Sequence, residues 1–145
     1  MTFSITILGS SSALPTSQRF PSAHVLNARE RLFLIDCAEG TQIQLRRYKA
    51  KFSRIDSIFI SHLHGDHVLG LVGLISTLNL LGRNKELTIY AHAPLEPILR
   101  QNINFFVDEL MFPIRFISLD TKRSKVIYQQ GDIVVESIPL KHRIA

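Results

Sequence analysis

The sequence predicts an α/β fold, and three observations support that prediction. The chain has 145 residues, of which 46% are hydrophobic and 20% charged, as expected of one packed globular domain. Residues 57–60, Ser-Ile-Phe-Ile, form an unbroken β-branched and aromatic run, which is typical of a strand buried on both faces of a layered sheet. Strand-like and helix-like segments also alternate along the chain. We therefore expect residues 1–145 to belong to a single domain.

Hydrophobic spacing and Gly/Pro punctuation predict where each element lies. In the first part of the chain we expect a strand at residues 3–8, a strand hairpin at 23–26 and 31–36, a helix at 42–49 and the buried strand at 57–60. In the second part we expect a helix at 68–81, a strand at 87–91, a helix at 94–107, a strand at 114–118 and a hairpin at 126–128 and 133–138. Phe3, Ile5 and Ile7 share one face of the first strand. The 68–81 helix is hydrophobic around most of its circumference, so we expect it to be buried and to end at Gly82.

The chain is mildly basic. Lys and Arg number 17 and Asp and Glu 12, which gives a net charge of +5 and a pI near 9.7. Such a surplus favours polyanionic partners but identifies none of them. Arg46, Arg47 and Lys49 form the outer side of the 42–49 helix, where a solvated surface is favoured over an RNA-contacting one.

Cysteine usage and hydrophobic segments indicate a cytoplasmic protein without a membrane partner. Cys37 is the single cysteine, which excludes an internal disulfide and suits a reducing compartment. It follows a hydrophobic run, so we expect a small buried side chain rather than a nucleophile. The first residues lack the features of a signal peptide, and the longest hydrophobic segment, residues 68–81, is too short to span a bilayer.

The strongest motif, Ser-His-Leu-His-Gly-Asp-His, follows the buried strand. His62 and His64 stand two residues apart in an extended segment, so both project to the same side. Gly65 allows a sharp turn, and Asp66 and His67 then lie in the first turn of a helix, where a carboxylate is favoured by the helix dipole. One pair of donors can hold a first metal ion and the other pair a second ion a few ångströms away.

A single histidine more often has a structural role than a metal-binding one. The full spacing His-x-His-x-Asp-His arises rarely by chance in this composition, and the motif stands at the carboxyl end of a buried strand, where α/β folds bind ligands. The metal-binding interpretation is therefore favoured for the loop. His24 and His92 lie outside it and are interpreted as structural.

The motif resembles the hallmark loop of the metallo-β-lactamase superfamily, and four stretches together resemble the ribonuclease Z family of tRNA 3′-processing endonucleases. These stretches are residues 8–16 with Arg19 following, residues 36–42, residues 61–74 and residues 139–143. Ala38 stands where the family usually has glycine, and Val72 where it often has proline. The resemblance implies the αββα sandwich of the superfamily, of which residues 1–145 would be the N-terminal part with the C-terminal half absent.

Carried over position by position, the resemblance assigns roles to six residues. It makes His62, His64 and His142 ligands of a first zinc ion. It makes Asp66 and His67 ligands of a second, with Asp66 also the proton acceptor in catalysis. Asp36 would support the loop by orienting an imidazole, although a purely structural carboxylate at a strand end is an equal alternative.

The resemblance implies a zinc-dependent endoribonuclease that removes the 3′ trailer from precursor tRNA and leaves a 3′-hydroxyl. Family members are roughly twice as long, and their second half supplies further metal ligands. We therefore expect this chain to be a fragment without full activity of its own. Loss of the layer covering half of the sheet would expose hydrophobic surface, which favours a homodimer.

Two other functions stay open. One is another hydrolase of the superfamily, acting on a small phosphodiester, an aryl sulfate, a lactam or a thioester. Residues 9–19 and 36–42 argue against it, and activity on precursor tRNA relative to small phosphodiesters would decide. The other is a non-catalytic fragment that binds zinc or a partner without turnover, which metal analysis beside a nuclease assay would distinguish.

Overall fold

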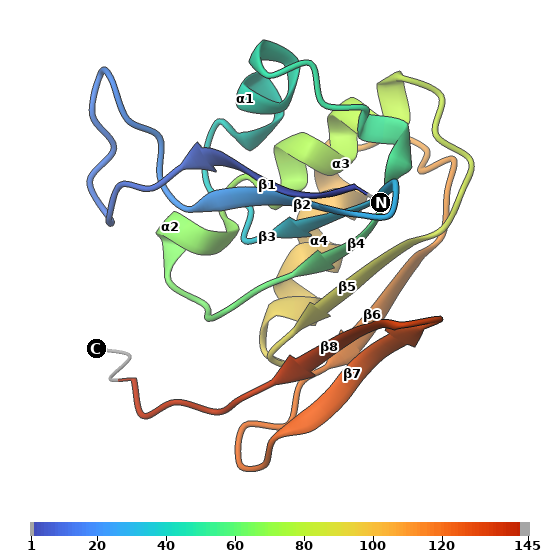
Figure 1. Ribbon diagram of the computed structural model, residues 1–145. Coiled ribbons are helices and arrows are strands. Elements are labelled where there is room, and N and C mark those ends of the chain that lie inside the picture. The colour runs from blue at the N-terminus through green and yellow to red at the C-terminus, as the bar shows by residue number, and fades with distance from the viewer. Residues whose placement is uncertain (1, 143–145) are drawn as a thin grey trace.

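Six strands form one sheet in sequential order (Figure 1). The computed structural model describes residues 2–142. The strands are β1 (Phe3–Gly9), β2 (Ala23–Ala28), β3 (Arg31–Ile35), β4 (Ile55–Phe59), β5 (Leu87–Ala91) and β6 (Ile114–Ser118). The pairs β1–β2 and β2–β3 are antiparallel, whereas β3 to β6 run parallel. The parallel strands therefore end at the same edge of the sheet. Residues 61–67, which the sequence predicts to bind metal and which are called the metal loop below, follow β4 at that edge.

The helices cover one face of the sheet. They are α1 (Thr41–Arg47), the short 3-10 helix η1 (Phe52–Arg54), α2 (Gly65–Val68), α3 (Leu71–Leu80) and α4 (Leu95–Phe106). Leu34, Ile58 and Ile89 project from the central strands toward this side, where they pack with buried residues of the helices, such as Leu74 and Leu99. This cluster is the main hydrophobic core, and its burial supplies the main driving force for folding.

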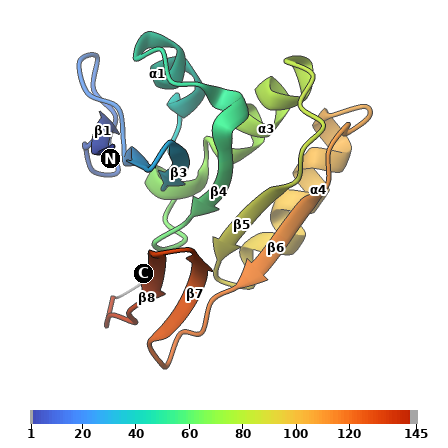
Figure 2. The same cartoon turned by 45° about the vertical axis from the view of Figure 1, so that its right-hand side comes forward.

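A two-stranded antiparallel sheet of β7 (Lys125–Gln130) and β8 (Ile133–Ser137) lies against the opposite face. Figure 2 shows this hairpin on the side of the sheet away from α3 and α4. It packs on a second cluster built around Phe33, Phe59 and Tyr90. The hairpin does not cover β1, whose Phe3, Ile5 and Ile7 are 72%, 58% and 56% exposed. The predicted exposure of hydrophobic sheet surface is thus present at β1.

The structure agrees with most predicted elements and corrects two. The 68–81 helix is divided, since α2 ends at Val68 and α3 begins at Leu71. At the break the backbone N–H of Gly70 donates to the carbonyl of Cys37 at 2.9 Å. The expected burial of this helix holds for Leu71, Leu74, Ile75 and Leu78 but not for its end, where Leu80 is 84% exposed. β4 begins two residues before the predicted strand, at Ile55, which pairs with Leu32 of β3.

Two smaller predictions are confirmed. Cys37 is fully buried. Gly82 follows the end of α3 with φ of 76°, a left-handed conformation that glycine adopts at low cost. Among the described residues, no helix has the length and hydrophobicity needed to cross a membrane.

Candidate metal centre

The sheet places two parts of the centre side by side. Asp36 follows β3 and the metal loop follows β4, and these strands are neighbours. The backbone N–H of Asp36 donates to the carbonyl of Phe59 at 2.8 Å, and that of Ile60 donates to the carbonyl of Tyr90. The backbone ladder thus continues to the start of the loop, so both segments leave the sheet at a fixed position.

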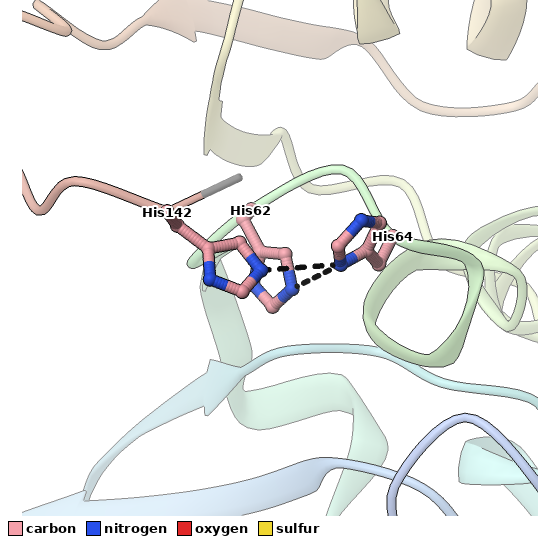
Figure 3. Close-up of side chains that lie close together, drawn as sticks. All are labelled: His62, His64 and His142. Atoms are coloured by element: carbon pink, nitrogen blue, oxygen red, sulfur yellow. Dashed lines mark hydrogen bonds between the residues drawn. The ribbon is translucent and has the colours of Figure 1, made fainter. Parts of the chain in front are cut away.

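His62, His64 and His142 converge on one point (Figure 3). Nε2 of His62 lies 3.0 Å from Nδ1 of His64, and Nε2 of His142 lies 3.3 Å from the same nitrogen. One ligand atom from each of the three residues lies within 4.8 Å of the others. The loop supplies two of these residues, and the segment after β8 brings the third from 78 residues along the chain. Figure 1 shows that segment running from β8 toward α2.

This donor set fits a divalent metal ion. Three imidazole nitrogens are the ligands of many zinc sites, and two donors on one tetrahedral zinc ion stand roughly 3.4 Å apart for bonds of about 2.1 Å. The separations of 3.0 and 3.3 Å at His64 are close to that value. Three protein ligands are also the number that leaves a fourth position open for water or substrate.

Asp66 and His67 form a second donor pair in the first turn of α2. Oδ2 of Asp66 lies 3.5 Å from Nε2 of His67, which also fits two ligands of one ion. The ring centroids of His62 and His67 lie 3.9 Å apart, with the ring planes tilted by 51°. The second pair therefore lies directly beside the three-histidine cluster, as a two-metal site requires.

Asp36 connects these parts, and both of its carboxylate oxygens are engaged. Oδ1 accepts the backbone N–H of Ser61 at 2.8 Å, and Oδ2 accepts the hydroxyls of Ser22 and Ser61 at 3.0 Å. Oδ2 also lies 2.6 Å from Nδ1 of His67. Asp36 has φ of 57°, the left-handed region that Asp tolerates better than most residues. The buried carboxylate thus contacts the imidazole of His67.

The electrostatics of the cluster favour the neutral imidazole of His62 in the absence of a metal. Burial lowers the pKa of His62, and the neighbouring His67, His64 and His142 lower it further. A metal ion binds the neutral form of imidazole, so the same environment prepares His62 to act as a ligand.

Other features of the molecule lie outside the loop from His62 to His67. Within the described part of the chain, the group of side chains that could hold a metal ion contains neither His24 nor His92. Sequence reasoning missed Ser22, because nothing in the local pattern indicates a contact with Asp36. An open hollow of about 400 Å³ lies between the 15–21 loop and the start of α1, and Arg19 and Phe20 line it.

The family model described as Anti-Pycsar protein Apyc1 matches residues 3–106, which is more than half of the chain. The chain belongs to the Anti-Pycsar protein Apyc1 family. The match includes the loop from His62 to His67 and ends before His142.

Curated relatives of similar sequence are named ribonuclease Z. The chain is 49% identical over 142 residues to ribonuclease Z of Phocaeicola vulgatus and 50% identical over 142 residues to that of Bacteroides fragilis. Each match covers 98% of this chain, but only 46% and 47% of those relatives. The chain thus spans about half the length of the curated relatives it matches. The resemblance to the ribonuclease Z family is confirmed.

Solved structures agree with this relationship. The short form of human tRNase Z is similar with a TM-score of 0.84 and 34% identity, over 97% of this chain and 61% of the human chain. The metallo-β-lactamase fold protein YhfI from Bacillus subtilis has a TM-score of 0.61 at 17% identity over 91% of this chain and 56% of YhfI, which shows the fold alone. The predicted metallo-β-lactamase fold is confirmed, and this fold implies a divalent metal.

Proposed function

We propose that this chain is part of a zinc-dependent endoribonuclease that removes the 3′ trailer from precursor tRNA and leaves a 3′-hydroxyl on the tRNA. The observation that supports this most is the convergence of His62, His64 and His142 beside the Asp66–His67 pair. The names of the relatives, ribonuclease Z, give the substrate class. We infer that residues 1–145 are the N-terminal part of a single domain.

The residues divide between two zinc ions. His62, His64 and His142 would hold the first, and Asp66 and His67 the second. Zinc bound there would supply Lewis-acid stabilisation of the scissile phosphate and a water of lowered pKa. His67 presents Nε2 to this site because its Nδ1 faces the Asp36 carboxylate.

Asp66 has two proposed roles. Its carboxylate is first a ligand beside Nε2 of His67. It is also the acidic group that we assign to accept the proton of the attacking water, although a carboxylate bound to a cation is a weak base. The main effect of removing Asp66 would therefore be a loss of metal affinity, and the loss of proton transfer would be secondary.

The number of ligand atoms at each site predicts that the two zinc sites are unequally occupied in this chain. The first site has three histidine ligands, which suffice for an open zinc site. The second has two donors, Asp66 and His67, and would bind weakly without ligands from elsewhere. We therefore expect the 145-residue chain to bind one zinc ion and to lack full nuclease activity by itself.

Three further features belong to the proposal. The net charge of +5 suits a precursor tRNA as partner. The exposed Phe3, Ile5 and Ile7 on β1 favour assembly, and we propose a homodimer. The absence of an internal disulfide, with one buried cysteine, suits the cytoplasm.

The test is a cleavage assay with the protein made from its complete open reading frame. A precursor tRNA with a 3′ trailer is incubated with the zinc-loaded protein, and the new 3′ end is mapped. We expect cleavage at the trailer junction that is lost in His64→Ala and kept in His24→Ala, since His24 lies outside the metal-binding group. Full cleavage by His64→Ala would refute the proposal.

A second candidate function stays open. The family model matches residues 3–106, which include the loop from His62 to His67 but not His142. Hydrolysis of a small phosphodiester by the same loop is the alternative. Comparing the rate on precursor tRNA with the rate on a small phosphodiester in one preparation distinguishes the two, because only the ribonuclease proposal predicts a strong preference for tRNA.

A further inference from the structure

The β7–β8 hairpin carries one of the three clustered histidines. It forms a sheet of two strands that is not hydrogen-bonded to the six-stranded sheet. An isolated two-stranded hairpin is only marginally stable in water, so its position depends on side chains that attach it. His142 is the fifth residue after Ser137, the last residue of β8. Whatever attaches the hairpin to the main sheet therefore also controls where His142 lies.

Tyr128 of β7 makes the central contacts of this attachment. Its ring packs edge-on against Phe33 with centroids 5.1 Å apart and against Phe59 at 6.4 Å. Its hydroxyl accepts a hydrogen bond from Nη1 of Arg31 at 3.2 Å and donates one to Oε1 of Gln130 at 2.8 Å. Aromatic pairs of this geometry contribute stability beyond that of the buried area alone.

The two partners of Tyr128 lie on the strands that lead into the metal centre. Phe59 is the last residue of β4, three positions before His62. Phe33 is on β3, three positions before Asp36. One tyrosine ring thus contacts the strands that present the loop and belongs to the hairpin that presents His142. A second link joins the β2–β3 turn to the β7–β8 turn, because Arg29 of the first forms an ion pair with Asp132 of the second.

We propose that Tyr128 is a positioning residue that holds His142 beside His64 by docking the β7–β8 hairpin onto Phe33 and Phe59. The ring does not touch the three-histidine cluster, so its effect on that site passes through the hairpin. The inference rests on the proposed metal-binding function of His62, His64 and His142. It assigns to the aromatic cluster a role in site assembly in addition to its role in stability.

The length of the free segment that precedes His142 determines how much zinc affinity should fall when the hairpin is released. With the hairpin docked, the free segment runs from Ser137 to His142. With the hairpin released, it runs from Ser118, the last residue of β6. The free segment then becomes almost five times longer. Because the probability of loop closure falls as the 3/2 power of segment length, the local concentration of His142 at the site falls about tenfold. We therefore expect zinc affinity to fall about tenfold when docking is lost.

A double-mutant cycle tests this. Zinc affinity is measured by chelator competition for the wild-type chain, Tyr128→Ala, His142→Ala and the double variant. We expect Tyr128→Ala to weaken binding about tenfold in the wild-type background and to have no effect when His142 is already absent. Tyr128→Phe keeps the ring and should restore most of the affinity. Val134→Ala, an exposed β8 position, is the matched control and should leave it unchanged.

Two further measurements keep the test decisive. Thermal unfolding of each variant shows whether it is folded, and Tyr128→Leu replaces Tyr128→Ala if the latter is not. In the metal-free chain, NMR contacts between the His142 and His64 rings should be present in the wild type and absent in the folded Tyr128 variant. These contacts do not depend on zinc binding.

The possible failures are distinguishable. Equal losses of affinity from the Tyr128 substitution in both backgrounds, or no loss in either, would overturn the positioning role. Persistence of the His142–His64 ring contacts in the folded Tyr128 variant would overturn it as well. A wild-type chain that binds no zinc would instead refute the proposed metal site, and the ring contacts alone would then decide the positioning role.

Discussion

Oδ2 of Asp36 lies 2.6 Å from Nδ1 of His67, and this contact joins the end of β3 to the first turn of α2. This geometry directs Nδ1 of His67 to the carboxylate and Nε2 to the side of Asp66, where a cation would bind. The two serine hydroxyls that also donate to Asp36 hold the carboxylate in place. The orientation of His67 is thus set by the neighbouring strand rather than by α2 itself.

Replacing this carboxylate should weaken the second metal site. Asp36→Asn keeps the shape but loses the charged acceptor for His67, and such outer partners of metal ligands typically contribute 10- to 100-fold in affinity. We expect a loss of about this size for the second zinc ion, measured by chelator competition on the protein made from its complete open reading frame. Asp120→Asn is the control, because Asp120 pairs with Lys125 in a turn outside the cluster. Equal effects of the two substitutions would contradict the role of Asp36.

Acid should destabilise the metal-free chain through His62. Burial, followed by the neighbouring histidines, lowers the pKa of His62 below its ordinary value of 6.5. As the pH falls below that value, the unfolded state binds the proton first, so the free energy of unfolding decreases. Above pH 6.5, His62 is neutral in both the folded and the unfolded state and does not change the free energy of unfolding. Urea unfolding between about pH 7.5 and 5.5 should show this decrease, with a smaller decrease for His62→Gln.

The control for this pH effect is His24→Gln, which changes a histidine outside the metal-binding group. Identical pH profiles of the wild type and His62→Gln would show that His62 is not the responsible group.

A methyl group at Gly70 should destabilise the fold. A Cβ built at this position would overlap the carbonyl oxygen of Ala38 and lie 2.9 Å from that of Cys37. Both contacts are with backbone atoms, which cannot move aside cheaply, so we expect Gly70→Ala to cost about 1–3 kcal/mol of unfolding free energy. Denaturant unfolding measures it. Gly131→Ala is a useful comparison: its Cβ meets nothing within 4 Å, although its φ of 61° adds some strain.

The thiol of Cys37 should be unreactive in the folded chain. The side chain is fully buried, and burial raises its pKa to about 12. The thiolate is the reactive form, so a thiol reagent at about pH 8 should react with the native chain far more slowly than with the denatured chain. Rapid labelling of the folded protein would show that the β3–α1 segment opens readily.

Much of the fold followed from the sequence, and the exceptions have long-range causes. Alternation over β1 and the Gly131 turn between β7 and β8 are local signals, so these elements were predicted close to their bounds. The division of the 68–81 helix depends on the hydrogen bond from Gly70 to Cys37, more than 30 residues away. Local periodicity contains no information about such a contact.

The candidate site divides in the same way. The loop from His62 to His67 was identified from spacing, because its donors are close in sequence. His142 was assigned through the family resemblance, and the structure places it within 3.3 Å of His64. The contacts of Ser22 with Asp36 and of Tyr128 with Phe33 join segments with no shared motif, so only the folded chain reveals them.

The most direct test of the three-histidine site is X-ray absorption spectroscopy at the zinc edge, on the 145-residue chain loaded with one equivalent of zinc. We expect three imidazole ligands at about 2.0–2.1 Å with a light atom in the fourth position, and loss of one imidazole in His142→Ala. A sulfur ligand at about 2.3 Å, or a ligand set unchanged in His142→Ala, would contradict this expectation.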